Sequence, residues 1–361
     1  MAEAKLRAGI VGCGGIAFGK HLPNMTAAGK FEIVACCDIE EDRAQKAAKE
    51  YGIEGAKVYT DYKKLLEDKT IDVIYVLTPN SSHAPITVDS LNAGKHVMCE
   101  KPMAKTSAEA REMVETAKKT GKVLTIGYQT RFFKQSQYIK KMVERGDLGE
   151  IYYAKAHATR RRAVPTWGVF LDGEKQGGGP LIDIGTHALD VTLWLMDNYK
   201  PKSVMGNVYH KLNGNGNCGN IFGPWDPAEF TVEDSAFGFI TMEDGATISL
   251  ESSWALNSLE CREAKSTLCG TKAGADWRFD DVRINGDDFG KLYDKTPILG
   301  GGGVAFFEGA GADEKVMEQL TFYNAVTKGS ELVIKPEQAF VVTQILEAIY
   351  ESAATGKLVT F

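Results

Sequence analysis

The stretch that most constrains the fold lies near the N-terminus, where a short apolar run leads through glycines into a helical pattern. Leu6–Val11 predicts a strand, and a helical pattern continues to about residue 28. Gly12, Gly14 and Ala17 fill the three small positions of a G-x-G-x-x-A turn, which places a helix N-terminus against a dinucleotide pyrophosphate. Taken alone, the glycines fit an ordinary strand–helix turn equally well. The predicted cofactor contacts here are Gly12, Cys13, Gly14, Gly15 and Ile16.

The second apolar run, Phe31–Cys37, ends at Asp38. An acidic residue roughly 20 to 30 positions after the glycines can accept both ribose hydroxyls of an adenosine and repels a 2′-phosphate. No arginine follows until Arg43. This arrangement predicts NAD rather than NADP as the cofactor. The alternative is that Asp38 merely caps the helix that starts near Glu40.

Strand and helix patterns alternate up to residue 127, with further strands at 71–77, 95–100 and 123–127. Short links between them predict a parallel, doubly wound sheet, whose ligands bind beyond the carboxyl ends of the strands. The loops after these strands are also compatible with plain turn chemistry. They supply the remaining predicted cofactor contacts: Thr78, Pro79, Asn80, His83, Glu100, Lys101, Pro102 and Gln129.

A second group of polar residues follows the glycine run 177–179. The pattern predicts a helix from about residue 181 to Met196, on which Asp183 and His187 are four positions apart and share one face. The alternative is that Asp183 caps this helix and His187 is a hydrogen-bonded histidine inside the fold.

Residues 203–289 alternate in the manner of strands, which predicts a mostly antiparallel sheet with one covered face. Helical patterns at 314–328 and 337–354 end the chain. The predicted fold class is therefore α/β, with an N-terminal Rossmann domain (residues 1–128) and a C-terminal α/β domain (residues 129–361) built on a large open sheet. The closing helix can pack back on the Rossmann domain.

Composition excludes several classes of protein. The 361 residues carry a net charge of −6, so no basic excess points to nucleic acid. No apolar run is long enough to span a bilayer, and residues 1–5 lead into a strand without a signal-peptide pattern. The seven cysteines lack CxxC spacing and the histidines are dispersed, so a reduced cytoplasmic setting and no metal are expected.

Three motifs together resemble those of the glucose-fructose oxidoreductase / inositol dehydrogenase (Gfo/Idh/MocA) family. They are the glycine turn 12–17, Glu100-Lys101-Pro102, and the run 178–187 with its Asp-x-x-x-His pattern. The resemblance covers essentially the whole chain. It implies a Rossmann domain, an α/β domain whose open sheet packs against a partner subunit, and hydride transfer between a nicotinamide and a secondary alcohol of a sugar or cyclitol. It also implies that the Lys101–Pro102 bond is cis.

The same resemblance implies that Lys101, Asp183 and His187 form the catalytic trio. Oxidation of an alcohol requires loss of the hydroxyl proton, and a histidine titrates near working pH. Lys101 can stabilise the developing alkoxide, and Asp183 can hold the hydroxyl or orient His187.

The substrate is predicted from a smaller set of residues. Arg160, Arg161 and Arg162 alternate on the predicted strand 151–162, so at least one guanidinium faces the cleft, unless all are salt-bridged in solvent. Trp167 can stack on a sugar ring or on the cofactor, or pack in the core. The predicted substrate contacts are Tyr128, His157, Arg160, Arg162, Thr166 and Trp167.

The context of these residues also resembles a bacterial subgroup that oxidises the C3 hydroxyl of glucosides. The leading hypothesis is an NAD-dependent glycoside 3-dehydrogenase that works as a homo-oligomer assembled through its C-terminal sheet. Three alternatives remain open: an inositol 2-dehydrogenase, an NAD-dependent glycosidase that acts through a 3-keto intermediate, and a non-catalytic sugar-sensing regulator.

Overall fold

The computed structural model describes residues 4–299 and 314–361, and these form two compact units. The first unit contains the residues up to 132 together with 314–340, and the second contains 133–299 and 341–361. The predicted boundary at residue 128 lies close to this division, but the first unit also takes in a later stretch of the chain. The division falls within the last helix, α10 (Pro336–Thr355).

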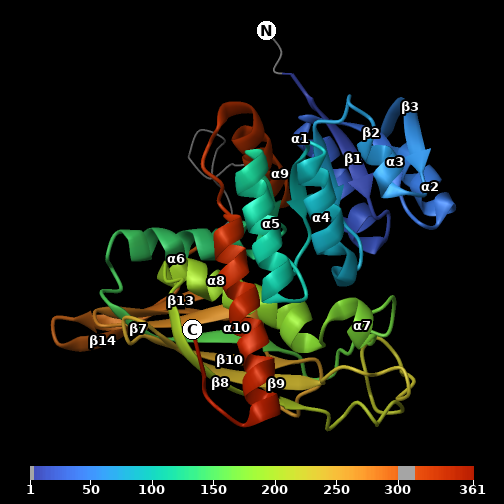
Figure 1. The fold of residues 1–361 in the computed structure, drawn as a ribbon. Helices are drawn as coiled ribbons and strands as arrows, with labels where there is room; N and C mark the ends of the chain where they lie inside the picture. The colour runs from blue at the N-terminus through green and yellow to red at the C-terminus, as the bar shows by residue number, and fades with distance from the viewer. Residues whose placement is uncertain (1–3, 300–313) are drawn as a thin grey trace. The chain divides into compact units, whose positions relative to one another are not determined.

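The first unit is built on a parallel sheet of six strands in the order β3-β2-β1-β4-β5-β6 (Figure 1). This is the strand order of a Rossmann fold, and it confirms the predicted doubly wound sheet. The strands are β1 (Leu6–Val11), β2 (Phe31–Cys37), β3 (Gly52–Tyr59), β4 (Val73–Val76), β5 (His96–Cys99) and β6 (Leu124–Ile126).

Helices follow the strands of the first unit, and a late helix completes its core. Phe322 and Tyr323 on α9 are buried in the same apolar cluster as Tyr75 of β4, and the Tyr75 and Phe322 rings meet edge to face at 5.9 Å. The unit therefore depends on α9. Its helices are α1 (Leu22–Ala28), α2 (Glu41–Tyr51), α3 (Tyr62–Leu66), α4 (His83–Asn92), α5 (Ser107–Thr120) and α9 (Glu314–Lys328).

The second unit is built on a sheet of nine strands in the order β14-β13-β12-β11-β7-β10-β9-β8-β15. Among these neighbours, β7 and β10 pair in parallel and the other pairs run antiparallel, so the predicted mostly antiparallel sheet is confirmed. The strands are β7 (Ile151–Thr159), β8 (Pro201–Tyr209), β9 (Ser235–Met242), β10 (Thr247–Ser253), β11 (Glu263–Gly270), β12 (Ala273–Trp277), β13 (Val282–Asp288), β14 (Lys291–Lys295) and β15 (Val359–Thr360).

One face of this sheet is covered by helices. In Figure 1, α6 (Lys134–Glu144) and α8 (Thr186–Met196) lie along one side of the sheet. The last helix approaches the same face closely, because a Cβ added to Gly206 or Gly238 would lie within 3 Å of Ile349. A short helix, α7 (Gly173–Gln176), precedes the glycine run.

The sequence patterns located most elements to within a few residues but missed β3, α3, α7 and the strands β12 to β15. A further difference concerns the arginines, because β7 ends at Thr159 and not at Arg162. Arg160, Arg161 and Arg162 therefore do not alternate on a strand. No helix within the described residues is long and apolar enough to cross a membrane.

Candidate active site

The glycine turn after β1 leaves room for a phosphate. Gly12 has φ +93°, and a Cβ there would lie 2.6 Å from the Leu77 carbonyl, so only glycine fits. A Cβ added to Gly14 or Gly15 meets no atom within 4 Å. The space over the turn is therefore open where a pyrophosphate would approach the backbone. Ala17 is fully buried and opens a five-residue π-helical turn, Ala17–His21, that leads into α1.

Asp38 joins the end of β2 to the glycine turn. One carboxylate oxygen accepts a hydrogen bond from the Cys13 N–H at 2.7 Å, and the other accepts from the Glu40 N–H at 3.0 Å. The N-cap of α2 is Glu40, and that helix has no side-chain cap. Asp38 therefore does not cap α2, and its oxygens keep lone pairs for ribose hydroxyls.

Two further loops of the first unit are tied together at the carboxyl edge of the sheet. The buried His83 ring lies between two carbonyl oxygens, at 2.7 Å from that of Pro102 and 2.9 Å from that of Thr78. Burial lowers the pKa of His83. The Thr78 hydroxyl oxygen is buried, and no hydrogen-bond partner for it occurs within residues 4–299 and 314–361. A buried hydroxyl without a partner fits a bound cofactor that completes its hydrogen bonding.

A buried charged cluster supports the Glu100-Lys101-Pro102 step. Glu100 forms an ion pair with Lys20 at 2.7 Å, and Lys20 also pairs with Glu318 of α9 at 3.0 Å. The His21 ring contacts the same Glu100 oxygen at 2.7 Å. Burial alone would raise the pKa of Glu100, but Lys20 and His21 outweigh it and hold this pKa well below its usual value.

This cluster fixes the backbone at the predicted catalytic lysine. The other Glu100 oxygen accepts a hydrogen bond from the Lys101 N–H at 3.0 Å. The Lys101–Pro102 peptide bond is cis, as the resemblance implied. Lys101 is half-buried and lies two residues after the end of β5. Gln129, another predicted cofactor contact, begins the short 3₁₀ turn after β6.

Asp183 and His187 lie at the start of the helix that the sequence predicted, but the helix does not begin as an α-helix. Leu181–Gly185 forms a π turn, and α8 continues from Thr186. Both side chains are half-buried, whereas their neighbours on the helix are mostly buried. Asp183 accepts a hydrogen bond from the indole N–H of the fully buried Trp254 at 3.0 Å. Because π turns in α-helices often occur at functional sites, this irregularity favours the functional interpretation.

The two predicted substrate arginines differ in how many of their N–H groups already have partners within the structure. Arg160 forms a two-pronged ion pair with Glu263, with both contacts at 2.6 Å, and also donates to the Ala163 carbonyl. Arg162 donates to Asn257 at 2.8 Å, but its other terminal nitrogen is buried and has no hydrogen-bond partner within the described ranges. Arg162 therefore offers an unused donor, and Arg160 serves mainly to hold its own loop.

Trp167 is not a core residue, because half of its surface (52%) is exposed. It packs edge to face against Phe222 at 4.7 Å and against Phe170 at 5.8 Å. Phe170 in turn lies 6.5 Å from Trp254, the indole that contacts Asp183. A run of aromatic rings within the second unit thus connects the exposed Trp167 to Asp183.

Trp167 and Thr166 line a surface cavity of about 600 Å³ together with Leu171, Lys175 and Thr231. The Thr166 hydroxyl donates to the Phe222 carbonyl at 2.6 Å. The cavity walls therefore combine an aromatic face with hydroxyl and charged groups. Such a combination suits a ligand with both ring faces and hydroxyls.

Two predicted substrate residues are placed elsewhere by the structure. His157 lies on β7 between Ala156 and Ala158, and its ring contacts Thr267 at 3.0 Å. On the covered face of this sheet, Ser266 of β11 accepts from Thr192 of α8 and pairs with Ala156. Because side chains alternate along a strand, His157 points to the other face, away from α8. Tyr128 has no exposed surface.

The sequence did not single out Lys20, His21, Glu318, Trp254 or Glu233 as site residues. Glu318 lies almost 300 positions from Lys20 along the chain, so no spacing rule could join them. The available signal was weak, namely charged residues within otherwise apolar helical faces. Within the described residues, no group of histidine, cysteine, aspartate and glutamate side chains could hold a metal ion.

Comparisons with known proteins agree with this geometry. Residues 6–128 match the model of the GFO/IDH/MocA oxidoreductase family with an NAD-binding Rossmann fold, and residues 136–276 match the GFO/IDH/MocA C-terminal domain. A D-glucoside 3-dehydrogenase from Escherichia coli is 38% identical over 99% of this chain and 97% of its own length. An inositol 2-dehydrogenase from Salmonella paratyphi B is 36% identical over 55% of this chain and 57% of its own length.

Solved structures show the same fold over the whole chain. A levoglucosan dehydrogenase in complex with NADH and levoglucosan has a TM-score of 0.83 at 22% identity, with 99% of each chain covered. An aldose-aldose oxidoreductase from Caulobacter crescentus has a TM-score of 0.81 at 23% identity, with 99% of this chain and 100% of its own covered.

The Rossmann fold and the match to the family model define an NAD-dependent oxidoreductase. The chain belongs to the Gfo/Idh/MocA family. The residues of the first unit fit NAD, because the open glycine turn, Asp38 and the orphaned Thr78 hydroxyl lie on loops after parallel strands. This geometry is compatible with the predicted contacts of the glycine turn with the pyrophosphate and of Asp38 with the adenosine ribose.

Replacement of Asp38 separates its two roles. Asp38→Asn keeps an oxygen for the Cys13 N–H but loses the charge, so NAD should bind about 10- to 100-fold more weakly and NADP should be tolerated better. Asp38→Ala should show both effects and also lower thermal stability. Fluorescence titration with both cofactors and a melting curve measure this. Unchanged preference for NAD in both variants would restrict Asp38 to a structural role.

Removal of Lys20 tests the buried charged cluster. Lys20→Met leaves the Glu100 and Glu318 carboxylates buried without their shared cation, so the free energy of unfolding should fall by about 3–5 kcal/mol. Urea denaturation measures this, with the exposed Lys49→Met as the control, expected within about 0.5 kcal/mol of the parent. Equal stability of the two variants would show that Lys20 does not compensate these carboxylates.

Proposed function

We propose that this protein oxidises the C3 hydroxyl of a glucoside with NAD and releases the 3-keto glycoside. The observation that carries the proposal is the full-length similarity to the Escherichia coli D-glucoside 3-dehydrogenase, combined with the presence of Lys101, Asp183 and His187 at the positions that the family motifs assign to catalysis. The similarity to inositol 2-dehydrogenase covers only about half of the chain. This difference in coverage favours the glucoside.

Each proposed catalytic group has a distinct task. When bound, NAD would supply the acceptor for the hydride that leaves the carbon bearing the reacting hydroxyl. His187 removes the hydroxyl proton, and the Lys101 ammonium stabilises the negative charge that develops on that oxygen. Asp183, oriented by Trp254, accepts a hydrogen bond from a substrate hydroxyl or from His187. Loss of a hydride from the carbon and of a proton from the oxygen would leave a ketone, and the bound cofactor would take up the two electrons of the hydride.

The second unit supplies the proposed contacts for the sugar. The unused Arg162 nitrogen is a donor for a hydroxyl oxygen, and the exposed Trp167 ring is a surface on which a pyranose can stack. The Thr166 side chain lies beside both the cavity and Phe222. His157 belongs to the other face of the sheet and is not part of the proposed sugar site.

Isotope transfer tests the reacting position directly. Methyl glucoside labelled with deuterium at C3 should give deuterated NADH and a product that has lost one deuterium and one hydrogen, whereas label at C2 or C4 should stay in the sugar. Mass spectrometry of both products measures this. Label transfer from another carbon contradicts C3 oxidation. Turnover of myo-inositol alone favours the cyclitol dehydrogenase, and aglycone release without net NADH favours the glycosidase.

Lys101→Ala should lower kcat by about 10²- to 10³-fold, because a donor to the developing alkoxide is lost. NAD affinity should stay within a few-fold, since the glycine turn and Asp38 are untouched. Arg161→Ala, a cation on the exposed loop after β7, is the control with expected parental turnover. A Lys101→Ala enzyme with parental kcat would remove this residue from the mechanism.

We further propose that the protein assembles as a homo-oligomer through the bare face of its large sheet. Alternate residues on that face include Met205 of β8 and its cross-strand neighbour Phe239 of β9, which are 44% and 55% exposed. Two adjacent large apolar side chains on an uncovered sheet are costly in water and suit a self-complementary interface.

Phe239→Lys places a charge on this face and should shift the protein to a smaller species. Sedimentation velocity of Phe239→Lys and of the parent protein measures the change. The control is Phe279→Lys, an equally drastic change at a residue that is 64% exposed in the turn between β12 and β13. Identical sedimentation of parent and Phe239→Lys would exclude this face as the interface.

A further inference from the structure

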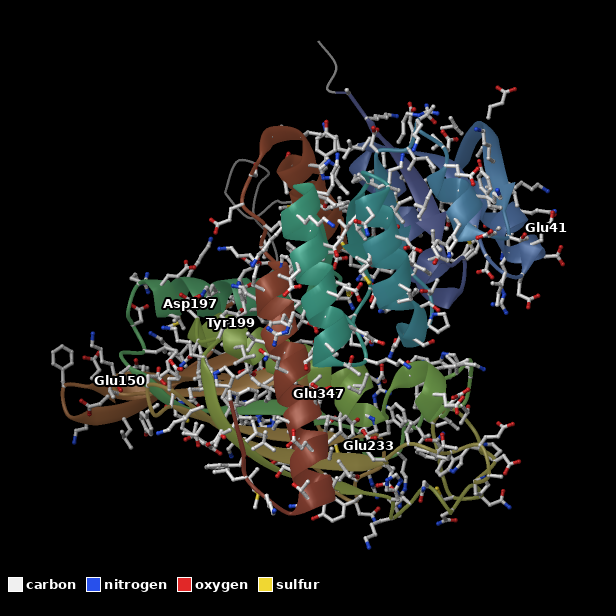
Figure 2. All side chains as sticks on the ribbon, in the orientation of Figure 1. Glu41, Glu150, Asp197, Tyr199, Glu233 and Glu347 are labelled. Carbon is white, nitrogen blue, oxygen red and sulfur yellow. The ribbon has the colours of Figure 1, made fainter. Side chains whose placement is uncertain are left out.

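Glu233 is a buried carboxylate that the proposed chemistry does not use. It lies just before β9 and is 3% exposed, and no ion pair reaches it within the described parts of the chain. Its oxygens instead accept hydrogen bonds from the N–H groups of Gly179 at 2.9 Å and Leu181 at 3.1 Å. The Tyr350 hydroxyl donates to it at 2.8 Å. Figure 2 labels Glu233 beside α10, the helix that carries Tyr350.

These bonds hold the start of the helix that carries Asp183 and His187. The first N–H groups of a helix lack partners within the helix, and a carboxylate there is stabilised by the helix dipole. Pro180, the N-cap of the π turn, makes no side-chain cap bond of its own. Glu233 therefore takes the place of a local cap, although it is more than 50 positions away in sequence.

The segment before the helix is packed closely against Glu233 and Tyr350. A Cβ added to Gly178 would lie 2.0 Å from the Tyr350 hydroxyl oxygen, and one added to Gly179 would lie 2.2 Å from the Glu233 carbonyl oxygen. Neither glycine has a positive φ, so close packing and not backbone conformation requires glycine here. Gly178 and Gly179 are therefore tightly packed in the structure.

We propose that Glu233 and Tyr350 are positioning residues that determine the location of the Asp183 and His187 side chains during catalysis. The proposal rests on the proposed function of Asp183 and His187. Leu181, whose N–H is held, lies two residues before Asp183, and His187 follows about one turn later. A shift of the held segment is therefore transmitted along the helix to both side chains, and displacements near 1 Å can cost about 100-fold in rate.

The chemistry of the pair supports this role. Burial raises the pKa of Glu233, and the bonds from Gly179, Tyr350 and Leu181 oppose that effect by favouring the carboxylate. Burial and the nearby Glu233 charge raise the pKa of Tyr350 well above its usual value, so its hydroxyl keeps the proton that it donates. A glutamine at 233 would offer only one acceptor oxygen and would turn an N–H₂ toward a backbone N–H.

The test compares Glu233→Gln, Tyr350→Phe and Glu233→Asp in steady-state kinetics with the glucoside and NAD. Glu233→Gln should lower kcat about 100-fold with a much smaller change in KM, and Tyr350→Phe should lower it about 10-fold. Glu233→Asp, which keeps the charge, should restore part of the rate. NAD affinity should be unchanged, because the cofactor loops belong to the first unit. The exposed Glu243→Gln and Tyr152→Phe are the matched controls.

A double variant separates positioning from general stability. When Glu233→Gln is added to Asp183→Asn, the further loss in kcat should be small, because the pair acts through Asp183 and His187. If the loss of kcat in the double variant equals the product of the losses in the two single variants, the proposal is overturned. A parental kcat in Glu233→Gln also overturns it. If Glu233→Gln does not fold, Tyr350→Phe decides by the same two criteria.

The outcomes also distinguish this proposal from the proposed function. Parental kcat in both Asp183→Asn and His187→Ala contradicts the catalytic assignment itself. A strongly lowered kcat in Asp183→Asn, together with parental kcat in Glu233→Gln and Tyr350→Phe, contradicts the positioning pair alone.

Discussion

A buried carboxylate requires donors, and this requirement organises the functional loops in both units. Each of three carboxylates accepts a backbone N–H from one such loop: Asp38 from Cys13, Glu100 from Lys101, and Glu233 from Gly179 and Leu181. The cost of burying the charge is offset only when these bonds form. The buried carboxylates therefore fix the loops, because the N–H groups of the loops must donate hydrogen bonds to them.

The three carboxylates are satisfied in different ways. Glu100 has a cation, Lys20, and also contacts His21, so it belongs to a charged cluster that reaches α9. Glu233 relies on backbone N–H groups and a tyrosine hydroxyl. Asp38 is bonded on both oxygens by backbone donors but lies next to the open glycine turn. This last arrangement leaves Asp38 the most available of the three for a ligand.

Local patterns in the sequence were sufficient for much of the fold. The parallel alternation of the first unit follows from short apolar strands and amphipathic helices, and β1, β2 and α9 have the predicted limits. The short or polar strands were missed, because β3 and β14 are largely exposed and carry little apolar periodicity. The assignment of α9 to the first unit depends on the burial of Phe322 against Tyr75, a contact between distant parts of the chain.

The site was predicted less completely than the fold, for the same reason. Motifs singled out Gly12, Asp38, Lys101 and Asp183 as candidate site residues, because their signals are local. The supporting contacts, such as Trp254 with Asp183 and Glu318 with Lys20, become visible only when distant segments are brought together. His157 illustrates a different difficulty. Its residue type fits a sugar site, but the alternation of side chains along β7 places it on the other face of the sheet.

The π turns at Ala17–His21 and Leu181–Gly185 have a consequence for how this fold tolerates changes in length. Each turn accommodates an additional residue within an otherwise ordinary helix. A deletion inside Leu181–Gly185 would let the segment tighten into regular α geometry and rotate what precedes it by about 100° relative to α8. If the deleted residue lay between them, Asp183 and His187 would then lose their common orientation although both residues were still present. The relative orientation of these two side chains therefore depends on the number of residues between them as much as on the residues themselves.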